Sequence, residues 1–171
     1  MTDISLNEKL DRCAELLVAT YGDILRQRDR LNEQLDSGFI NMSKARSILG
    51  CSSLSAMQIP AELEPNVTVR VLEQEAADGA DGISYKDLTF QLSVAAPKRN
   101  DEQQQEAASA PLPSWFGALP PMSLKNSHKA FSSSIHTIAS ICELQARLHS
   151  LQLTYKQLVA SKKQPVKDDI S

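Results

Sequence analysis

Histidine is the residue type in this chain best suited to metal binding or proton transfer, and its three copies all fall in the C-terminal third: His128, His136 and His149. His128 and His136 are eight residues apart, so they can share one face of a helix. No acid or thiol is spaced to complete a metal site with them. We therefore expect exposed histidines, or histidines at the edge of a helix seam, with no metal and no cofactor.

We find no common catalytic motif in the sequence. Its glycines are scattered, and "DGADG" lacks the Lys-Ser/Thr of a phosphate-binding loop. G-x-S-x-G and H-E-x-x-H do not occur. Cys13, Cys51 and Cys142 are odd in number and far apart, which argues against a disulfide framework and against a zinc site. We expect a protein that is not an enzyme, has no small-molecule substrate and keeps reduced thiols.

Charge and hydropathy exclude two further classes of protein. The formal net charge is −3, from 18 basic and 21 acidic residues, and the basic residues form no patch that would neutralise a row of phosphates. Nucleic acid is therefore not an expected partner. No stretch approaches the roughly 20 apolar residues of a membrane span, and the first residues are polar. We expect a protein that is soluble or peripheral to a membrane.

The N-terminal segment has a helical pattern, because apolar residues recur at spacings of three, four or seven: Leu6, Leu10, Cys13, Leu17, Tyr21, Ile24, Leu31 and Leu35. Ser5 and Glu8 form a capping box that marks its start. Gly38 predicts its end. "FINMSKARSILG" then predicts a short second helix that ends at Gly50, with Phe39, Met42, Ala45 and either Ile48 or Leu49 facing inward.

A second long helix is predicted from Ser123, a suitable N-cap after two prolines. Phe131, Ile135 and Ile138 open its apolar stripe. Its later residues keep a strict three-four alternation, which is typical of a coiled-coil seam: Ile141, Leu144, Leu148, Leu151, Tyr155 and Leu158.

The middle of the chain changes period. "NVTVRVL" and "YKDLTFQLSV" alternate apolar and polar residues, which predicts a two-stranded ribbon. "AAPKRNDEQQQEAASAPLPS" has no such pattern and predicts a disordered linker. The fold class is therefore mainly α: an antiparallel long-helix (coiled-coil) hairpin with an inserted short helix, a small two-stranded β ribbon and a disordered linker.

The expected organisation follows from these patterns. Residues 1–50 hold the N-terminal long helix and the short helix, and 51–94 hold the inserted ribbon with its loops. The linker covers 95–113. The Trp-Phe-Gly segment and the C-terminal long helix cover 114–161, and a flexible tail covers 162–171.

Two groups of residues are candidates for binding a partner. "LPSWFGALPPMSL" holds the chain's single tryptophan beside a phenylalanine, and aromatic side chains are frequent interface anchors. Trp115 and Phe116 can instead cap the apolar end of the hairpin. Lys44 and Arg46 point outward from the short helix, and on composition alone they are solvated charges.

Two segments together resemble the soluble coiled-coil vacuolar-ATPase assembly factors, including animal coiled-coil-domain members and their fungal counterparts. They are "LNEQLDSGFINMSKARSILG" and "PLPSWFGALPPMSLKNSHKAF". The resemblance implies an assembly chaperone for the membrane-embedded proton-translocating sector of the vacuolar-type H+-ATPase, which supports vacuole or lysosome acidification. It implies a two-span membrane assembly factor and subunits of that sector as partners.

The resemblance also implies a location and a set of residues. The location is the cytosolic face of the endoplasmic reticulum membrane, as a peripheral protein, with Golgi intermediate, endosomal and lysosomal compartments as further locations. Gly38 and Gly50 would end helices, and Lys44 and Arg46 would meet a carboxylate or a lipid headgroup. The partner-binding candidates carried over are Trp115, Phe116, Gly117, Pro120, Leu124, Phe39, Lys44 and Arg46.

The alternative is a function without a role in assembly of the ATPase. Any short coiled coil can serve as an adaptor or tether in membrane traffic. Such a protein would self-associate through the seam from Ile141 to Leu158, whereas the chaperone would bury both apolar stripes internally.

Overall fold

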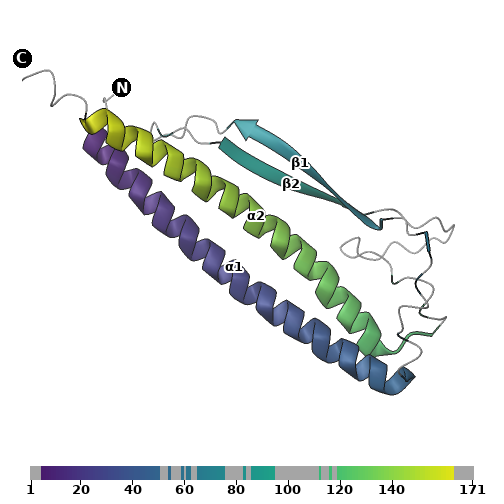
Figure 1. The fold of residues 1–171 in the computed structure, drawn as a ribbon. Helices are drawn as coiled ribbons and strands as arrows, with labels where there is room; N and C mark the ends of the chain where they lie inside the picture. Colours follow the sequence, from purple (N-terminus) through teal and green to yellow (C-terminus); the bar gives the residue numbers. More distant parts are fainter. Residues whose placement is uncertain are drawn as a thin grey trace, which may run out of the picture. The chain divides into compact units, whose positions relative to one another are not determined.

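A computed structural model describes residues 5–50, 54, 59, 61–62, 65–75, 83, 86–94, 112, 116 and 119–163. The elements in chain order are α1 (Leu6–Leu49), β1 (Val67–Glu75), β2 (Lys86–Val94) and α2 (Met122–Lys163) (Figure 1). The mainly helical class and the small ribbon are thus confirmed. The predicted linker, apart from Leu112, and the tail after Lys163 lie outside the described residues.

The chain forms two compact units. Unit 1 comprises Met1–Arg28, Val71–Phe90 and Ala139–Ser171, and unit 2 comprises Asp29–Arg70 and Gln91–Ile138. Each unit therefore contains part of both helices and part of both strands. In each unit a piece of α1 is paired with a piece of α2 that is distant in sequence. No helix among the described residues is long and apolar enough to cross a bilayer.

Local signals set both ends of α1, as the sequence predicts. The Ser5 amide donates to Glu8 Oε2 at 2.9 Å, and the Glu8 amide donates to Ser5 Oγ at 3.3 Å. This reciprocal capping box satisfies amides that have no partner within the helix. Gly50 has a φ of +84°, and its amide donates to the Arg46 carbonyl at 3.0 Å. A glycine adopts this left-handed conformation at low cost, so the helix ends there.

The predicted break at Gly38 is wrong, because α1 runs through that residue without interruption. The separate short helix is therefore the last part of α1. Gly38 is buried, and a Cβ atom added to it would lie 2.6 Å from Cε1 of Phe131. The missing side chain leaves room for an aromatic ring of α2. A glycine inside a helix lowers helix stability only modestly, so the helix continues through it.

The start of α2 also differs from the prediction. The Pro121 carbonyl accepts bonds from the amides of Leu124 (3.0 Å) and Lys125 (3.2 Å), so Ser123 lies within the first turn. Proline suits a helix start because its ring fixes φ in the helical range and its missing amide hydrogen has no intrahelical role there. The predicted serine cap is therefore wrong by two residues.

The ribbon is a two-stranded antiparallel sheet in the order β1-β2. Thr68 Oγ1 donates to the Ser93 carbonyl across the pair at 3.4 Å. In unit 1, β2 is attached to α2: the Phe90 amide donates to Glu143 Oε1 at 2.8 Å, and Arg147 Nη2 pairs with Asp87 Oδ2 at 2.5 Å. A two-stranded ribbon is marginal by itself, so these bonds to a helix help to stabilise it.

The core of unit 1 is apolar. Cys13, Ile83 and Leu151 are 0%, 3% and 1% exposed, and four partly buried side chains pack against them: Leu16, Leu17, Tyr155 and Leu158. The Cys13 thiol donates to the Leu151 carbonyl at 3.6 Å, and burial raises its pKa. The predicted stripes of both helices therefore meet here, with the first part of α1 against the last part of α2. Their classification as a coiled coil stays a prediction.

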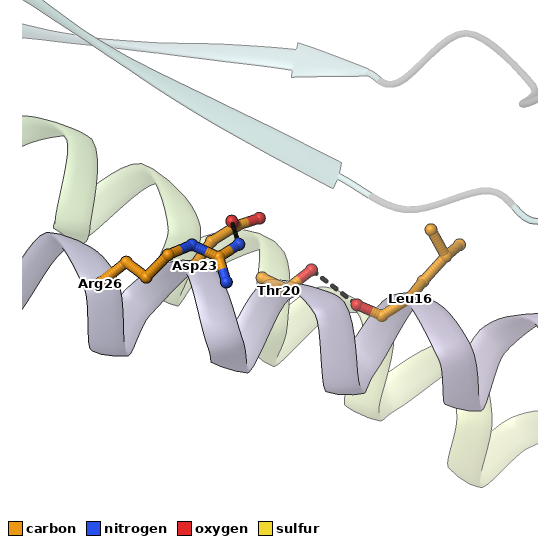
Figure 2. Close-up of polar contacts among 4 residues, drawn as sticks. All are labelled: Leu16, Thr20, Asp23 and Arg26. Atoms are coloured by element: carbon orange, nitrogen blue, oxygen red, sulfur yellow. Dashed lines mark hydrogen bonds and ion pairs between the residues drawn. The ribbon is translucent and has the colours of Figure 1, made fainter.

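One residue of the predicted N-terminal stripe is placed wrongly. Tyr21 is 55% exposed, and Thr20 is buried instead. The Thr20 hydroxyl donates to the Leu16 carbonyl at 2.7 Å within the helix, so its burial leaves no donor unsatisfied (Figure 2). Asp23 and Arg26 form an ion pair on the following turn (Figure 2). Spacings of three and four both fit one helical stripe, and local pattern cannot choose between adjacent positions.

Candidate partner-binding site

In unit 2 the helices meet through small residues. Ala45 and Ser127 are fully buried, and Gly38 is buried beside them. The Ser127 hydroxyl donates to the Gly38 carbonyl at 2.9 Å, which connects α2 directly to the backbone of α1. Small side chains permit this close approach, and the hydrogen bond satisfies a buried hydroxyl.

A glutamine from α1 extends this polar contact. Gln34 Nε2 donates to Ser133 Oγ at 3.0 Å, and Thr137 Oγ1 donates to Gln34 Oε1 at 2.9 Å. Both ends of the amide are therefore bonded to α2. Because a shift of either helix would break both bonds, the network favours a single alignment of the two helices in this unit.

An aromatic pair lies beside the small residues. Phe39 and Phe131 meet edge to face, with ring centroids 5.2 Å apart and planes at 74°. Phe39 is 60% exposed, so the prediction that it points inward is wrong. Its ring covers Phe131 from outside, since the inward position of α1 is already occupied by Gly38. Edge-to-face pairs of this kind add a modest stabilisation to the area they bury.

An apolar cleft of about 310 Å³ opens in unit 2 and is the candidate binding site. It is lined by Met42, Asn66, Val67, Leu112, Phe116, Leu124, His128, Phe131, Ser132 and Ile135. The lining therefore comes from α1, the start of β1 and the residue before it, α2, Leu112 and Phe116. Concave apolar surfaces with a few polar groups are the usual form of binding sites in proteins.

His128 is the titratable group of this cleft. Burial lowers the pKa of its imidazole, because the charged form loses hydration. The neutral ring offers one donor and one acceptor nitrogen. The cleft thus has a polar group that can orient a ligand, but its lining is otherwise dominated by aliphatic and aromatic side chains.

Exposed apolar side chains are also present in unit 2 outside the cleft. Leu119 is 94% exposed, and Met122 and Ile48 are each 67% exposed. The expected inward placement of Ile135 and Ile138 is wrong: buried serines and a threonine occupy the helix contact, and these isoleucines point away from it.

The structure brings together only part of the predicted site. Phe116 and Leu124 line the cleft. Pro120 is partly buried just before α2 and is not among the lining residues. Lys44 and Arg46 are exposed on α1 and do not line the cleft either. Three further predicted residues are accounted for differently: Phe39 packs on Phe131, whereas Trp115 and Gly117 lie outside the described residues.

Sequence reasoning missed most of the remaining lining. Met42 was expected to face inward, but its place beside His128 and Ile135 was not foreseen. The available signal was the run "SSSIHT" in a helical pattern: buried serines leave the neighbouring isoleucine on a different face.

Among the described residues there is no group of three or more histidine, cysteine, aspartate or glutamate side chains that could hold a metal ion. Within this part of the chain, the apolar cleft is the feature best suited to binding another protein.

Comparison with known proteins shows what this chain is similar to. The chain is 28% identical over 158 residues to vacuolar ATPase assembly protein VMA22 of Mus musculus, with 85% of this chain and 86% of the relative aligned. It is 24% identical over 176 residues to the protein of the same name from Homo sapiens, with 92% and 97% aligned. The corresponding values for Danio rerio are 25% over 173 residues, with 83% and 84% aligned. No family model matches the sequence. Over most of its length, the chain is thus similar to the vacuolar ATPase assembly factors.

Proposed function

We propose that this chain is an assembly chaperone of the vacuolar-type ATPase and acts on its membrane-embedded, proton-translocating sector. Support for a role in assembly comes from the names of its relatives, which align over most of its length. Support for action on a membrane-embedded target comes from the apolar character of the cleft in unit 2.

The apolar cleft is the single observation that carries the proposed mechanism. Phe116, Phe131 and Ile135 supply a surface on which the apolar face of a helix can dock, with anchors at successive turns. Leu119 and Met122 are further exposed apolar side chains of the same unit. Such binding shields apolar groups of an unassembled subunit from water until its final partner replaces the chaperone.

The proposal includes a place in the cell. The chain binds a two-span membrane assembly factor at the cytosolic face of the endoplasmic reticulum and reaches the membrane through that protein. Its loss would leave pump subunits unassembled, and vacuoles or lysosomes would be less acidic. The exposed Lys44 and Arg46 would meet acidic side chains or lipid headgroups at this membrane.

Affinity purification from gently solubilised cells tests the proposal. Two isoleucines of α2 provide matched variants: Ile135 lines the cleft and Ile138 does not, although their exposures are 36% and 44%. We expect wild type and Ile138→Glu to retain a two-span membrane protein and subunits of the proton-translocating sector, and Ile135→Glu to lose them. The double variant Trp115→Ala, Phe116→Ala should lose them as well.

Circular dichroism and thermal unfolding establish that each variant is folded. Equal recovery of pump subunits with both isoleucine variants would place the interface outside the cleft. Absence of pump subunits from the wild-type sample would refute the proposed function.

A further inference from the structure

The first part of α1 carries a second apolar stripe in addition to its seam with α2. We call Ala14, Val18, Tyr21 and Leu25 the outer stripe. Their spacings of four, three and four place them along one face of the helix. Val18 is 74%, Tyr21 55% and Leu25 45% exposed, so within the described part of the chain this face is largely open to solvent.

The surface of the outer stripe is hollowed in a way that suits another helix. Asp11, Ala14, Glu15, Val18 and Ala19 line a shallow depression. Four of them have the spacing i, i+3, i+4 and i+7, which forms the hole that receives a side chain in helix-helix packing. The stripe therefore has a small residue, Ala14, at the depression and bulky residues, Tyr21 and Leu25, further along the helix.

Gly22 lies on the same side of α1, and no described residue is close enough to it to exclude a side chain. A Cβ atom added to it would meet Nη1 of Arg26 at 3.6 Å, which is ordinary contact. This contrasts with Gly38, where an added Cβ would collide with a ring. A glycine inside a helix costs roughly 0.5–1 kcal/mol relative to alanine. Close approach by a second helix would explain why that cost is accepted.

The outer stripe is complementary to itself when a second copy runs antiparallel. In the alignment that pairs Leu25 with Ala14, Tyr21 falls opposite Val18. The same alignment places Asp11 opposite Arg28, once at each end of the contact, and both side chains are exposed. A parallel arrangement would instead place Asp11 against Asp11 and Arg28 against Arg28, so charge favours the antiparallel one.

We propose that two copies of this chain associate through the outer stripe in a two-fold antiparallel contact, with Leu25 of one copy seated in the depression of the other. Such a contact is isologous and closes on itself, which limits assembly to a dimer. It uses a face of α1 different from the seam with α2, so both copies keep their own helix pairing. The contact is small, which indicates a weak and reversible dimer.

Sedimentation velocity on the purified full chain, from about 1 to 100 µM, tests the proposal in the range of weak association. Wild type is expected to shift from monomer to dimer as its concentration rises. Val18→Glu should weaken the dimer about tenfold or more, since it places a charge in the centre of the contact. Leu153→Glu is the matched control, because Leu153 is 48% exposed on α2 outside the stripe. It should dimerise as wild type does.

Charge exchange tests the alignment itself. Asp11→Arg and Arg28→Asp should each weaken the dimer, because each creates two like-charge contacts, and the double exchange should restore it. A wild-type chain that stays monomeric over the whole concentration range would overturn the proposal. The outer stripe would then be a surface for a different protein. A dimer that Val18→Glu leaves intact, or that the double exchange fails to restore, would overturn it as well.

Discussion

Unit 1 and unit 2 pair the same two helices with different side chains. In unit 1 the contact is made by apolar residues such as Leu17, Leu151 and Tyr155 around a buried thiol. In unit 2 it is made by glycine, alanine, serine and threonine, with a bonded glutamine between them. In both units the contact residues recur at spacings of three and four along the helices. The two contacts therefore share this helical spacing but differ in the types of side chain that form them.

The two helix contacts suit different roles: the contact in unit 1 suits stabilising the fold, and the contact in unit 2 leaves apolar side chains for a partner. Unit 1 buries its large apolar side chains between the helices, where they stabilise the fold. Unit 2 buries Leu124, but it fills the helix contact mainly with small residues and leaves Ile135, Phe39 and Met122 at its surface. The apolar groups that a core would use are thereby available to a partner, and the hydrogen bonds to α2 retain a defined alignment.

The strongest test of this difference is Leu151→Ala in unit 1. Removing a buried leucine leaves a cavity, so the free energy of unfolding should fall by about 2–5 kcal/mol. Leu153→Ala, two residues away but 48% exposed, should cost less than about 1 kcal/mol. Denaturant unfolding measures both. Similar losses for the two variants would mean that the apolar seam does not dominate stability.

Gly38→Ala is the corresponding change in unit 2. The new methyl group would lie 2.6 Å from the Phe131 ring, so the helices must separate or the ring must turn. We expect a loss of about 1–3 kcal/mol in the free energy of unfolding. Gly22→Ala meets only ordinary contact and should stabilise a dilute, monomeric sample by about 0.5–1 kcal/mol. A neutral or stabilising Gly38→Ala would contradict the close approach.

The polar network of unit 2 should show a smaller, coupled effect. Thr137→Val removes the hydroxyl that donates to Gln34 Oε1, and Gln34→Ala removes the oxygen that accepts this hydrogen bond. A double-mutant cycle on unfolding free energies should give a coupling of about 0.5–1.5 kcal/mol. Additive losses would show that the two side chains do not act together.

The smallest effect concerns pH and the cleft. Burial lowers the pKa of His128, so the unfolded chain binds a proton more readily than the folded one does. Stability should therefore fall slightly as pH drops below about 6.5, the ordinary pKa of histidine. Unfolding of His128→Gln across pH 5–8 should lack this part of the decline, whereas His149→Gln, at an exposed position, should keep it. An unchanged pH profile in His128→Gln would refute the assignment.

Local features of the fold were predictable from sequence. Ser5 and Glu8 cap α1 through their own side chains, and Gly50 ends it through its own conformation, so neighbouring residues decide both. Strand alternation and the late seam of α2 are likewise repeated signals. Gly38 was misjudged because a glycine that ends a helix and one that admits a ring from a distant helix look identical in sequence.

The candidate site was less predictable because it depends on contacts between distant segments. Of the residues expected to bind a partner, Phe116 and Leu124 line the cleft. Nothing local indicates that Met42 and His128 would line the same cleft. Ile135 fits an inward apolar stripe by spacing, and only the burial of serines beside Gly38 turns it outward. Tertiary packing, not periodicity, selects the exposed face.

The central claim is that unit 2 uses its cleft to support assembly of the vacuolar-type ATPase. The most direct measurement is recovery of assembled proton-translocating sector, together with vacuolar or lysosomal pH, in cells that lack this protein and express a variant. We predict that wild type and Ile138→Glu restore both and that folded Ile135→Glu restores neither. Normal assembly and acidification in cells without the protein, or full rescue by Ile135→Glu, would contradict the claim.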